Sequence, residues 1–384
     1  MLNNRHLIRQ SNVKIKRFVL GNIVTFIALL AATVTCFFVK PDSQYLSYID
    51  FRTITCLFCM MLVIAALRNI RFFRILAKKI VSIFKNTRSA IIALVIITYI
   101  GSMLIANDMA LITFLPLGYL VLSETDKSGY MIFTFIMQNI AANLGGMLTP
   151  FGNPQNLFLY NYFHIPTGEF FTIMAIPFAV SFILLSICCI FIKKEPLIEH
   201  GVPTPEVKLD KPRTIIYLTL FAYAIIIVFR VVPYWTGLFM IPIIFIFDRK
   251  ALFQVDYMLL LTFVFFFIFA GNMARIPVIK EALSTLVNKN TLLTGVISCQ
   301  IISNVPSSIL LSAFTTDYRA LLIAVNIGGC GTLVSSLASL ITFRHYSALA
   351  NARKGKYLLW FHIANFGFLI ILTITAFITL RFLF

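Results

Sequence analysis

The sequence predicts an all-α polytopic membrane protein with an inverted repeat, and three observations carry that prediction. Hydrophobic residues make up 60% of the 384 residues and charged residues only 12%, with a mean hydropathy of +0.92. A soluble domain carries about 25% charged residues. Several apolar runs can cross a bilayer, whose hydrocarbon core needs about 20 helical residues. Polar interruptions of one kind occur twice, once in each half of the chain.

Long apolar runs with few charges are predicted to be spanning helices. The first of them is too long for the apolar core of a signal peptide, and no small-residue cleavage site follows it, so we expect it to be retained. The predicted spans are Phe18–Val39, Phe51–Leu67, Phe170–Ile192, Thr214–Val232, Trp235–Phe247, Tyr257–Gly271 and Leu358–Phe382.

Four further apolar regions carry polar residues, Gly or Pro near their middles. Ser89–Leu122 and Thr291–Thr315 are predicted to be re-entrant helical hairpins, with a full double span, which leaves the same sidedness, as the alternative for each. Tyr130–Tyr160 and Arg319–Phe343 are predicted to be broken spanning helices. Unwound backbone inside a membrane is tolerated only against protein or a water-filled cavity. These interruptions therefore predict an internal polar site.

Basic residues orient the chain. With a cytoplasmic N-terminus, 24 of the 32 Lys and Arg fall on the cytoplasmic side, as expected for membrane proteins. The positions of the basic residues behind the net charge of +18 therefore predict the orientation of the chain in the membrane. We expect no nucleic-acid partner. The segment 68–88 alternates basic and apolar residues at helical spacing, which predicts an interfacial helix, with a plain basic loop as the alternative. The inside segments are 1–17, 68–88, 124–129, 193–213, 248–256 and 344–357.

The same layout divides the chain into two halves. A basic cytoplasmic N-terminus (1–17) precedes a first transmembrane repeat (18–192), a cytoplasmic linker (193–213) and a second repeat (214–384). The seven Cys lie in apolar runs and the five His are scattered, with no metal-ligand spacing and no catalytic motif. We therefore predict neither an enzyme nor a bound cofactor.

A short motif repeats inside the two broken helices. Residues 143–149 and 326–332 both read N-x-G-G-x-x-T, and each follows a hairpin. The predicted topology brings the two hairpins in from opposite sides, which is the inverted repeat of many secondary transporters. A glycine-rich helix-packing motif could produce either stretch alone. It would not readily produce the same order of elements twice with opposite sidedness.

Freed carbonyls with Asn and Thr oxygens can coordinate sodium, and helix N-termini attract anions. The segment 150–156 is predicted to extend the first broken helix, where Asn153, Gln155 and Asn156 supply amide donors and acceptors. The alternative for this segment is a plain extracellular turn just past the helix end. Predicted cation-coupling residues, which also form the possible sodium site, are Asn107, Asp108, Gly145, Gly146, Thr149, Gly152, Asn304, Asn326, Gly328 and Gly329. Predicted substrate-binding residues are Asn107, Asn153, Pro154, Asn156, Ser303, Asn304 and Thr332.

Asp108 is the acidic residue that the sequence places deep in an apolar stretch, whereas the other 13 lie in loops or near span ends. A buried carboxylate is costly unless it is paired, protonated or bound to a cation. We therefore predict that Asp108 couples transport to protons or sodium. The alternative is a helix cap at the hairpin tip, and the two roles can coexist.

At these residues the chain resembles the ion transporter superfamily. That group includes divalent anion–sodium symporters (the dicarboxylate and citrate carriers), arsenite permeases and some sodium–proton antiporters. The overall resemblance is to bacterial permeases of the dicarboxylate carrier type, over nearly the whole chain. It implies elevator-like movement and a homodimer. The matching stretches are ANDMALITFLPL, NLGGMLTPFGNPQNL, SNVPSSILLSAFT and NIGGCGTLVSSLASLITF.

The hairpin tips depart from the dicarboxylate carriers. There each tip resembles Ser-Asn-Thr, which binds sodium and a substrate carboxylate. Here the matching positions are Ala106-Asn107-Asp108 and Ser303-Asn304-Val305, so only the second keeps the Ser and neither keeps the Thr. The first tip is more similar to arsenite permeases and sodium–proton antiporters, which favours proton coupling.

Together these features predict a secondary active transporter of a small, di- or tricarboxylate-like anion, coupled to sodium or protons. An arsenite permease or a sodium–proton antiporter is the alternative. A scaffold or receptor has no need of two polar helix breaks with opposite sidedness. The expected location is the cell membrane, with multiple spans and a cytoplasmic N-terminus. The expected partners are the bilayer, the anion and a second copy of the chain.

Overall fold

A computed structural model describes residues 22–81, 83–197 and 209–383. Within these ranges the chain is helical, and the sole β-type pairing is an isolated bridge between Asn86 and Pro196. Seven of the described helices are long and apolar enough to cross a membrane. The predicted class, an all-α polytopic membrane protein, is confirmed. The segment 1–17, most of the linker 193–213 and the first residues of the span Phe18–Val39 lie outside the described residues.

The two halves of the chain contain similar series of helices. The first half forms α2 (Ile23–Phe38), α3 (Tyr45–Tyr48), α4 (Phe51–Asn69), α5 (Phe72–Val81), α6 (Thr87–Ile105), α7 (Asn107–Glu124), η1 (Ser128–Tyr130), α8 (Met131–Gly145), η2 (Gly146–Leu148), α9 (Pro154–Tyr162) and α10 (Thr167–Ile190). The second half forms α11 (Lys211–Val228), η3 (Tyr234–Phe239), α12 (Met240–Phe247), α13 (Arg249–Phe253), α14 (Tyr257–Arg275), α15 (Pro277–Lys289), α16 (Thr291–Ile302), α17 (Asn304–Ser312), α18 (Tyr318–Ile327), α19 (Leu337–Ser347) and α20 (Lys354–Leu383).

From α4 to α10 and from α14 to α20 the order of elements is the same. Each series has a long helix, an amphipathic helix, a helical hairpin, an interrupted helix and a final long helix. The hairpins are α6–α7 and α16–α17, and the interrupted helices are α8–α9 and α18–α19. Within the segment 68–88, the residues Phe72–Val81 form the helix α5, in agreement with the amphipathic pattern.

One predicted span differs in the structure. The run Trp235–Phe247 forms the 3₁₀ helix η3 followed by the eight-residue helix α12, and the two together (Tyr234–Phe247) are apolar but shorter than the seven helices long enough to cross a membrane. Pro242 lies early in α12 and has no N–H for the carbonyl four residues before it. The α-helical ladder therefore cannot run unbroken from η3 into α12.

Asp and Asn side chains begin many of the helices. Asn86 caps the first hairpin by accepting the N–H of Ser89 at 3.0 Å, and Asn290 caps the second by accepting that of Leu293 at 2.9 Å. Such caps satisfy N–H groups that the helix itself leaves unpaired. Four acidic residues of the span ends serve in the same way, namely Asp50, Asp210, Asp256 and Asp317.

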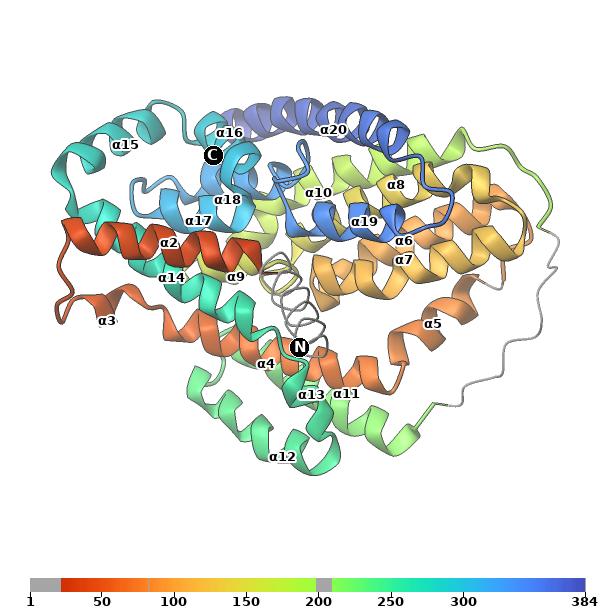
Figure 1. The fold of residues 1–384 in the computed structure, drawn as a ribbon, viewed down its shortest axis with the longest axis horizontal. Coiled ribbons are helices and arrows are strands. Elements are labelled where there is room, and N and C mark those ends of the chain that lie inside the picture. Colours follow the sequence, from red (N-terminus) through yellow and green to blue (C-terminus); the bar gives the residue numbers. More distant parts are fainter. Residues whose placement is uncertain (1–21, 82, 198–208, 384) are drawn as a thin grey trace, which may run out of the picture.

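The interrupted helices lie at the centre of the molecule. In the most apolar 18-residue window of Ser128–Leu148, 83% of the residues are buried. The corresponding share is 33% in α10, α11, α14 and α20, which turn apolar side chains outward. Figure 1 shows α2, α4, α11, α12 and α14 grouped on one side, with the hairpins, α10 and α20 on the other. Apolar outer faces around a polar centre are the pattern expected of a bundle that lies in lipid.

Candidate ion and substrate site at the helix breaks

Both hairpins turn on one residue with a positive φ. Ala106, between α6 and α7, has a φ of 62°, and Ser303, between α16 and α17, has a φ of 77°. This region is costly for residues with a Cβ, so the surrounding packing must hold both turns. In each tip the next residue, Asn107 or Asn304, accepts the following N–H with its side-chain oxygen at 2.9 Å. The two tips therefore share one local geometry.

In both interrupted helices a buried Asn precedes the N-cap of the following helix by the same number of residues. Asn143, near the end of α8, lies ten residues before Asn153, the N-cap of α9. Asn326, near the end of α18, lies ten residues before Ser336, the N-cap of α19. All four side chains are buried. The repeated motif thus begins at the same distance before the N-cap in both breaks.

Two threonines tie each interrupted helix to the hairpin of its own half. Thr149 Oγ1 donates to the carbonyl of Met103 at 2.6 Å, and Thr332 Oγ1 donates to the carbonyl of Gln300 at 3.1 Å. Each acceptor lies three residues before the positive-φ residue of its tip. Both hydroxyl hydrogens are thus used to hold the hairpins, while the lone pairs of the oxygens stay available.

Side chains of each break also bond to the other break. Asn153 Nδ2 donates to Asn326 Oδ1 at 3.2 Å, and Ser336 Oγ donates to Asn143 Oδ1 at 2.7 Å. Asn326 Nδ2 donates to Asn156 Oδ1 at 2.5 Å. These reciprocal bonds join residues more than 160 positions apart in the sequence. The structure therefore brings the predicted Asn residues of both halves into one buried polar network.

At most of the predicted glycines the neighbouring atoms leave no room for a Cβ. A Cβ at Gly145 would meet the carbonyl oxygen of Tyr99, and one at Gly146 would meet Asn153 Oδ1. At Gly329 the nearest atom would lie 3.2 Å away, a tight but less severe contact. The positions at which a Cβ would approach another atom within 3.0 Å are Gly145, Gly146, Gly152 and Gly328.

Four helices begin around one small pocket of about 20 Å³. These are α7, α9, α17 and α19, which belong to both hairpins and to both interrupted helices. The N-terminus of a helix presents unpaired N–H groups and a partial positive charge. Four such ends at one point favour an anionic group. The pocket lining includes Asn107, Asp108, Pro154, Gln155, Ser303, Asn304 and Ser336.

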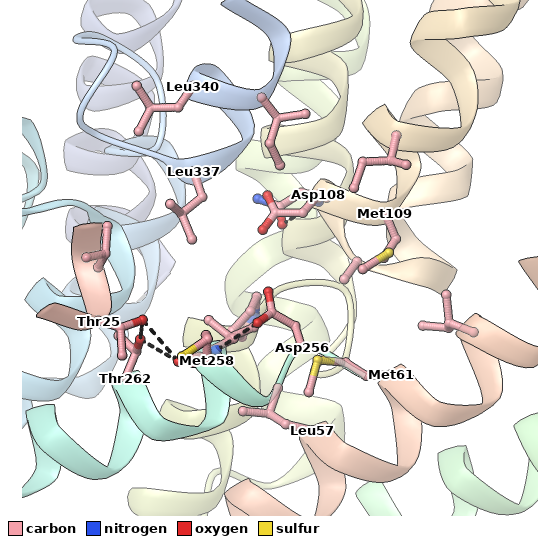
Figure 2. A pocket seen from close by; sticks show the side chains of 18 of the residues that line it. Thr25, Leu57, Met61, Asp108, Met109, Asp256, Met258, Thr262, Leu337 and Leu340 are labelled. Carbon is pink, nitrogen blue, oxygen red and sulfur yellow. Dashed lines mark hydrogen bonds between the residues drawn. The ribbon is translucent and has the colours of Figure 1, made fainter. Parts of the chain in front are cut away.

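Asp108 borders a larger cavity of about 200 Å³. Figure 2 shows its carboxylate across this opening from that of Asp256, with Thr25 and Thr262 on the wall between α2 and α14. Asp256 caps α14 through the N–H of Leu259 at 2.9 Å. Asp108 Oδ1 is buried and has no hydrogen-bond partner among the described residues. Such an oxygen can accept a proton or a cation.

Other polar atoms at the breaks lack partners within the described ranges. Asn143 Nδ2, Asn153 Oδ1 and both polar atoms of Gln155 are buried without a hydrogen bond. Buried polar groups are almost always bonded in native proteins. Two unmet acceptor oxygens and two unmet donor nitrogens within one region are chemically suited to a cation and an anion bound close together.

Two residues of this region, Asp256 and Gln300, escaped the sequence prediction. Asp256 faces Asp108 but reads in the sequence as one of the acidic residues in loops or near span ends. Gln300 donates to the carbonyls of Gly328 and Cys330, each at 3.0 Å, and so holds the second break open. Gln155 stands between two predicted residues, yet its unmet hydrogen bonds depend on packing that a sequence does not reveal.

Helix breaks around one polar site, inside a bundle with apolar outer faces, are typical of secondary transporters. The model of a family described as citrate transporter matches residues 15–320, and the chain belongs to this family. It is therefore a multi-pass membrane transporter and not an enzyme. The predicted ion transporter superfamily is confirmed, while a narrower relation to dicarboxylate carriers or arsenite permeases stays a prediction.

Two relatives are transporters or membrane proteins by name. The uncharacterized transporter MJ0456 of Methanocaldococcus jannaschii is 33% identical over 315 residues, which cover 81% of this chain and 85% of the relative. The inner membrane protein YbiR of Escherichia coli is 32% identical over 317 residues, which cover 80% of this chain and 82% of the relative. Both names agree with a membrane location.

Proposed function

We propose that this transporter carries a small carboxylate anion and couples its movement to sodium or protons. The observation that carries the proposal is the convergence of α7, α9, α17 and α19, whose N-termini surround one pocket beside Asp108. The helix ends would attract the carboxylates, and the unmet Asp108 oxygen would take the coupling ion. The family's description as citrate transporter supports this class of anion.

The larger cavity supports a route to that site. Its lining includes Asn22 before α2, Ile64 near the end of α4, Asp256 before α14 and Arg344 in the last turn of α19. We predict these four helix ends on the cytoplasmic side, from the distribution of basic residues. The cavity would then be the cytoplasmic entrance, and the N-terminus would lie in the cytoplasm.

The test is uptake into proteoliposomes that contain the purified full-length chain. Radiolabelled citrate, malate and succinate are supplied with an imposed sodium gradient, a pH gradient or neither. We expect uptake well above that of protein-free liposomes, and only with one of the gradients. Absence of carboxylate uptake under every gradient, from protein that is folded and correctly inserted, would overturn the proposal.

A sodium–proton antiporter is the second candidate, and the pair Asp108 and Asp256 on one cavity favours it. Two facing carboxylates could bind sodium and protons alternately without an organic anion. In the same liposomes, an entrapped pH dye would then report proton movement upon a sodium pulse in the absence of carboxylate. The proposed carboxylate symporter, in contrast, would give such a proton signal only when the carboxylate is present.

A further inference from the structure

Gln155 is a buried side chain with two unmet polar atoms. It is the second residue of α9 and only 1% exposed. Neither its Oε1 nor its Nε2 has a hydrogen-bond partner among the described residues. Burying an amide without partners is costly, so a buried amide with both its acceptor and its donors free points to a bound group.

The neighbouring amides have structural duties that Gln155 lacks. Asn156 Nδ2 lies within hydrogen-bond distance of the carbonyls of Gly146, Met147 and Thr149, at 3.1 to 3.2 Å. Asn153 Nδ2 donates to Asn326 Oδ1. These bonds shape the break and join the two halves. The Gln155 amide contributes nothing comparable, so a purely architectural role does not account for it.

Gln155 lines the small pocket at the convergence of the four helix N-termini. That pocket shares Asn107, Asp108, Pro154 and Leu337 with the larger cavity, so the two spaces adjoin. Its volume of about 20 Å³ suits one group the size of a water molecule. A ligand in the cavity could therefore insert one small polar group beside Gln155.

We propose that Gln155 determines specificity by binding a hydroxyl group of the carried anion, so that the site selects hydroxylated carboxylates. A side-chain amide offers one acceptor oxygen and N–H donors, and a hydroxyl group both donates and accepts. A carboxylate only accepts, so it would leave Gln155 Oε1 unmet. This inference rests on the proposed function and adds the chemical class of the substrate.

The test compares ligand pairs that differ by one hydroxyl group: malate with succinate, and citrate with tricarballylate. Binding is measured by calorimetry on the purified full-length transporter and uptake by radiolabel, for the wild type and Gln155→Met. Methionine keeps the length of the side chain but removes the amide. A site built to bind a hydroxyl rejects the analogue that lacks it, so we expect a wild-type preference of about tenfold or more for the hydroxylated member.

The matched control is Gln138→Met, which also replaces a buried glutamine. Gln138 Nε2 donates to Thr98 Oγ1 and to the Phe114 carbonyl, each at 3.1 Å. We expect Gln138→Met to lower the melting temperature and to keep the ligand preference. Gln155→Met should keep or raise the melting temperature of the ligand-free protein, because it removes two unmet polar atoms.

The outcomes separate this inference from the proposed function. Loss of the preference in Gln155→Met, through weaker binding of the hydroxylated member alone, would support the role of Gln155. An equal preference in wild type and Gln155→Met would overturn it while leaving carboxylate transport intact, and so would a wild type without preference. If the wild type transports none of the four anions, the proposed function and this inference both fail.

Discussion

The two hairpin tips share a backbone and differ in chemistry. Ala106 and Ser303 adopt the same kind of positive-φ turn, and the Asn that follows each of them caps the next N–H at 2.9 Å. The residue after that Asn is Asp108 in the first tip and Val305 in the second. The second tip is also tied to the break of its own half, since the Asn304 N–H donates to the Ser335 carbonyl at 2.9 Å.

This difference indicates that the two hairpin tips have different roles. The architecture of a hairpin locked by a threonine to a broken helix is present in both halves. A hairpin-tip carboxylate that borders the large cavity is present in the first half alone, because Val305 stands at the equivalent position of the second tip. The other carboxylate on this cavity, Asp256, belongs to the N-cap of α14. The proposed coupling therefore depends on one tip, while the second tip chiefly completes the pocket.

The largest expected effect comes from removing that carboxylate. We expect Asp108→Asn to reduce gradient-driven uptake to the level of protein-free liposomes, because an amide cannot take up a proton and binds cations poorly. The melting temperature should change little, since Asp108 Oδ1 has no hydrogen bond to lose among the described residues. Uptake in proteoliposomes and thermal melting of the same preparation measure the two effects.

Asp210→Asn is the matched control, because Asp210 caps α11 through the N–H of Arg213 and lines neither cavity. It should retain uptake. Normal gradient-driven uptake by Asp108→Asn would mean that the chemical difference between the two tips has no role in coupling.

The next effect compares the glycines of the two breaks. A Cβ at Gly146 would collide with Asn153 Oδ1, whereas one at Gly329 would lie 3.2 Å from the Asn326 carbonyl. Overpacking a tight site costs about 1–3 kcal/mol, so we expect Gly146→Ala to destabilise by about that amount. Gly329→Ala should cost distinctly less. Equal losses of melting temperature in the two variants would contradict this asymmetry between the breaks.

Local sequence signals account for much of the fold. Polar interruptions in apolar runs coincide with the helix ends at Ala106 and Ser303. Each of these two residues is followed by an Asn, so the polar residues next to the turn identify its position in the sequence. Length and hydropathy were sufficient for most long helices. They were insufficient for Trp235–Phe247, where Pro242 changes the local hydrogen bonding without changing the hydropathy.

Features that depend on distant packing could not be predicted. Asp256 faces Asp108 only because α14 and α7 border the same cavity. The reciprocal bonds of Asn153 and Ser336 with the opposite break require both halves to be folded together. The sequence shows that Gln155 supplies an amide to the first broken helix, but only burial shows that this amide is unmet. The N-terminal orientation and the homodimer stay predictions.

The smallest expected effect lies outside the membrane, where the first hairpin is clamped at its far end. Lys127, after α7, contacts Glu195 at 2.7 Å, and the Tyr130 hydroxyl donates to the same carboxylate at 3.4 Å. The hydrogen bond from Lys127 lowers the pKa of Glu195 below its ordinary value of 4.5. A lowered native pKa stabilises the fold above the unfolded-state pKa, and this stabilisation disappears as pH falls through the native pKa.

Glu195→Gln should therefore lower the melting temperature slightly at neutral pH, because the pair is partly exposed and screened by solvent. The difference from the wild type should shrink as the pH falls below 4.5 and vanish once Glu195 is protonated in both states. Thermal melts from pH 7 to acid measure this convergence. In a Lys127→Met background the pH at which the two melting temperatures converge should be higher, because the pKa of Glu195 is then lowered less. A constant difference at every pH would show that the clamp acts through packing, and the far end of the first hairpin would then need no charge.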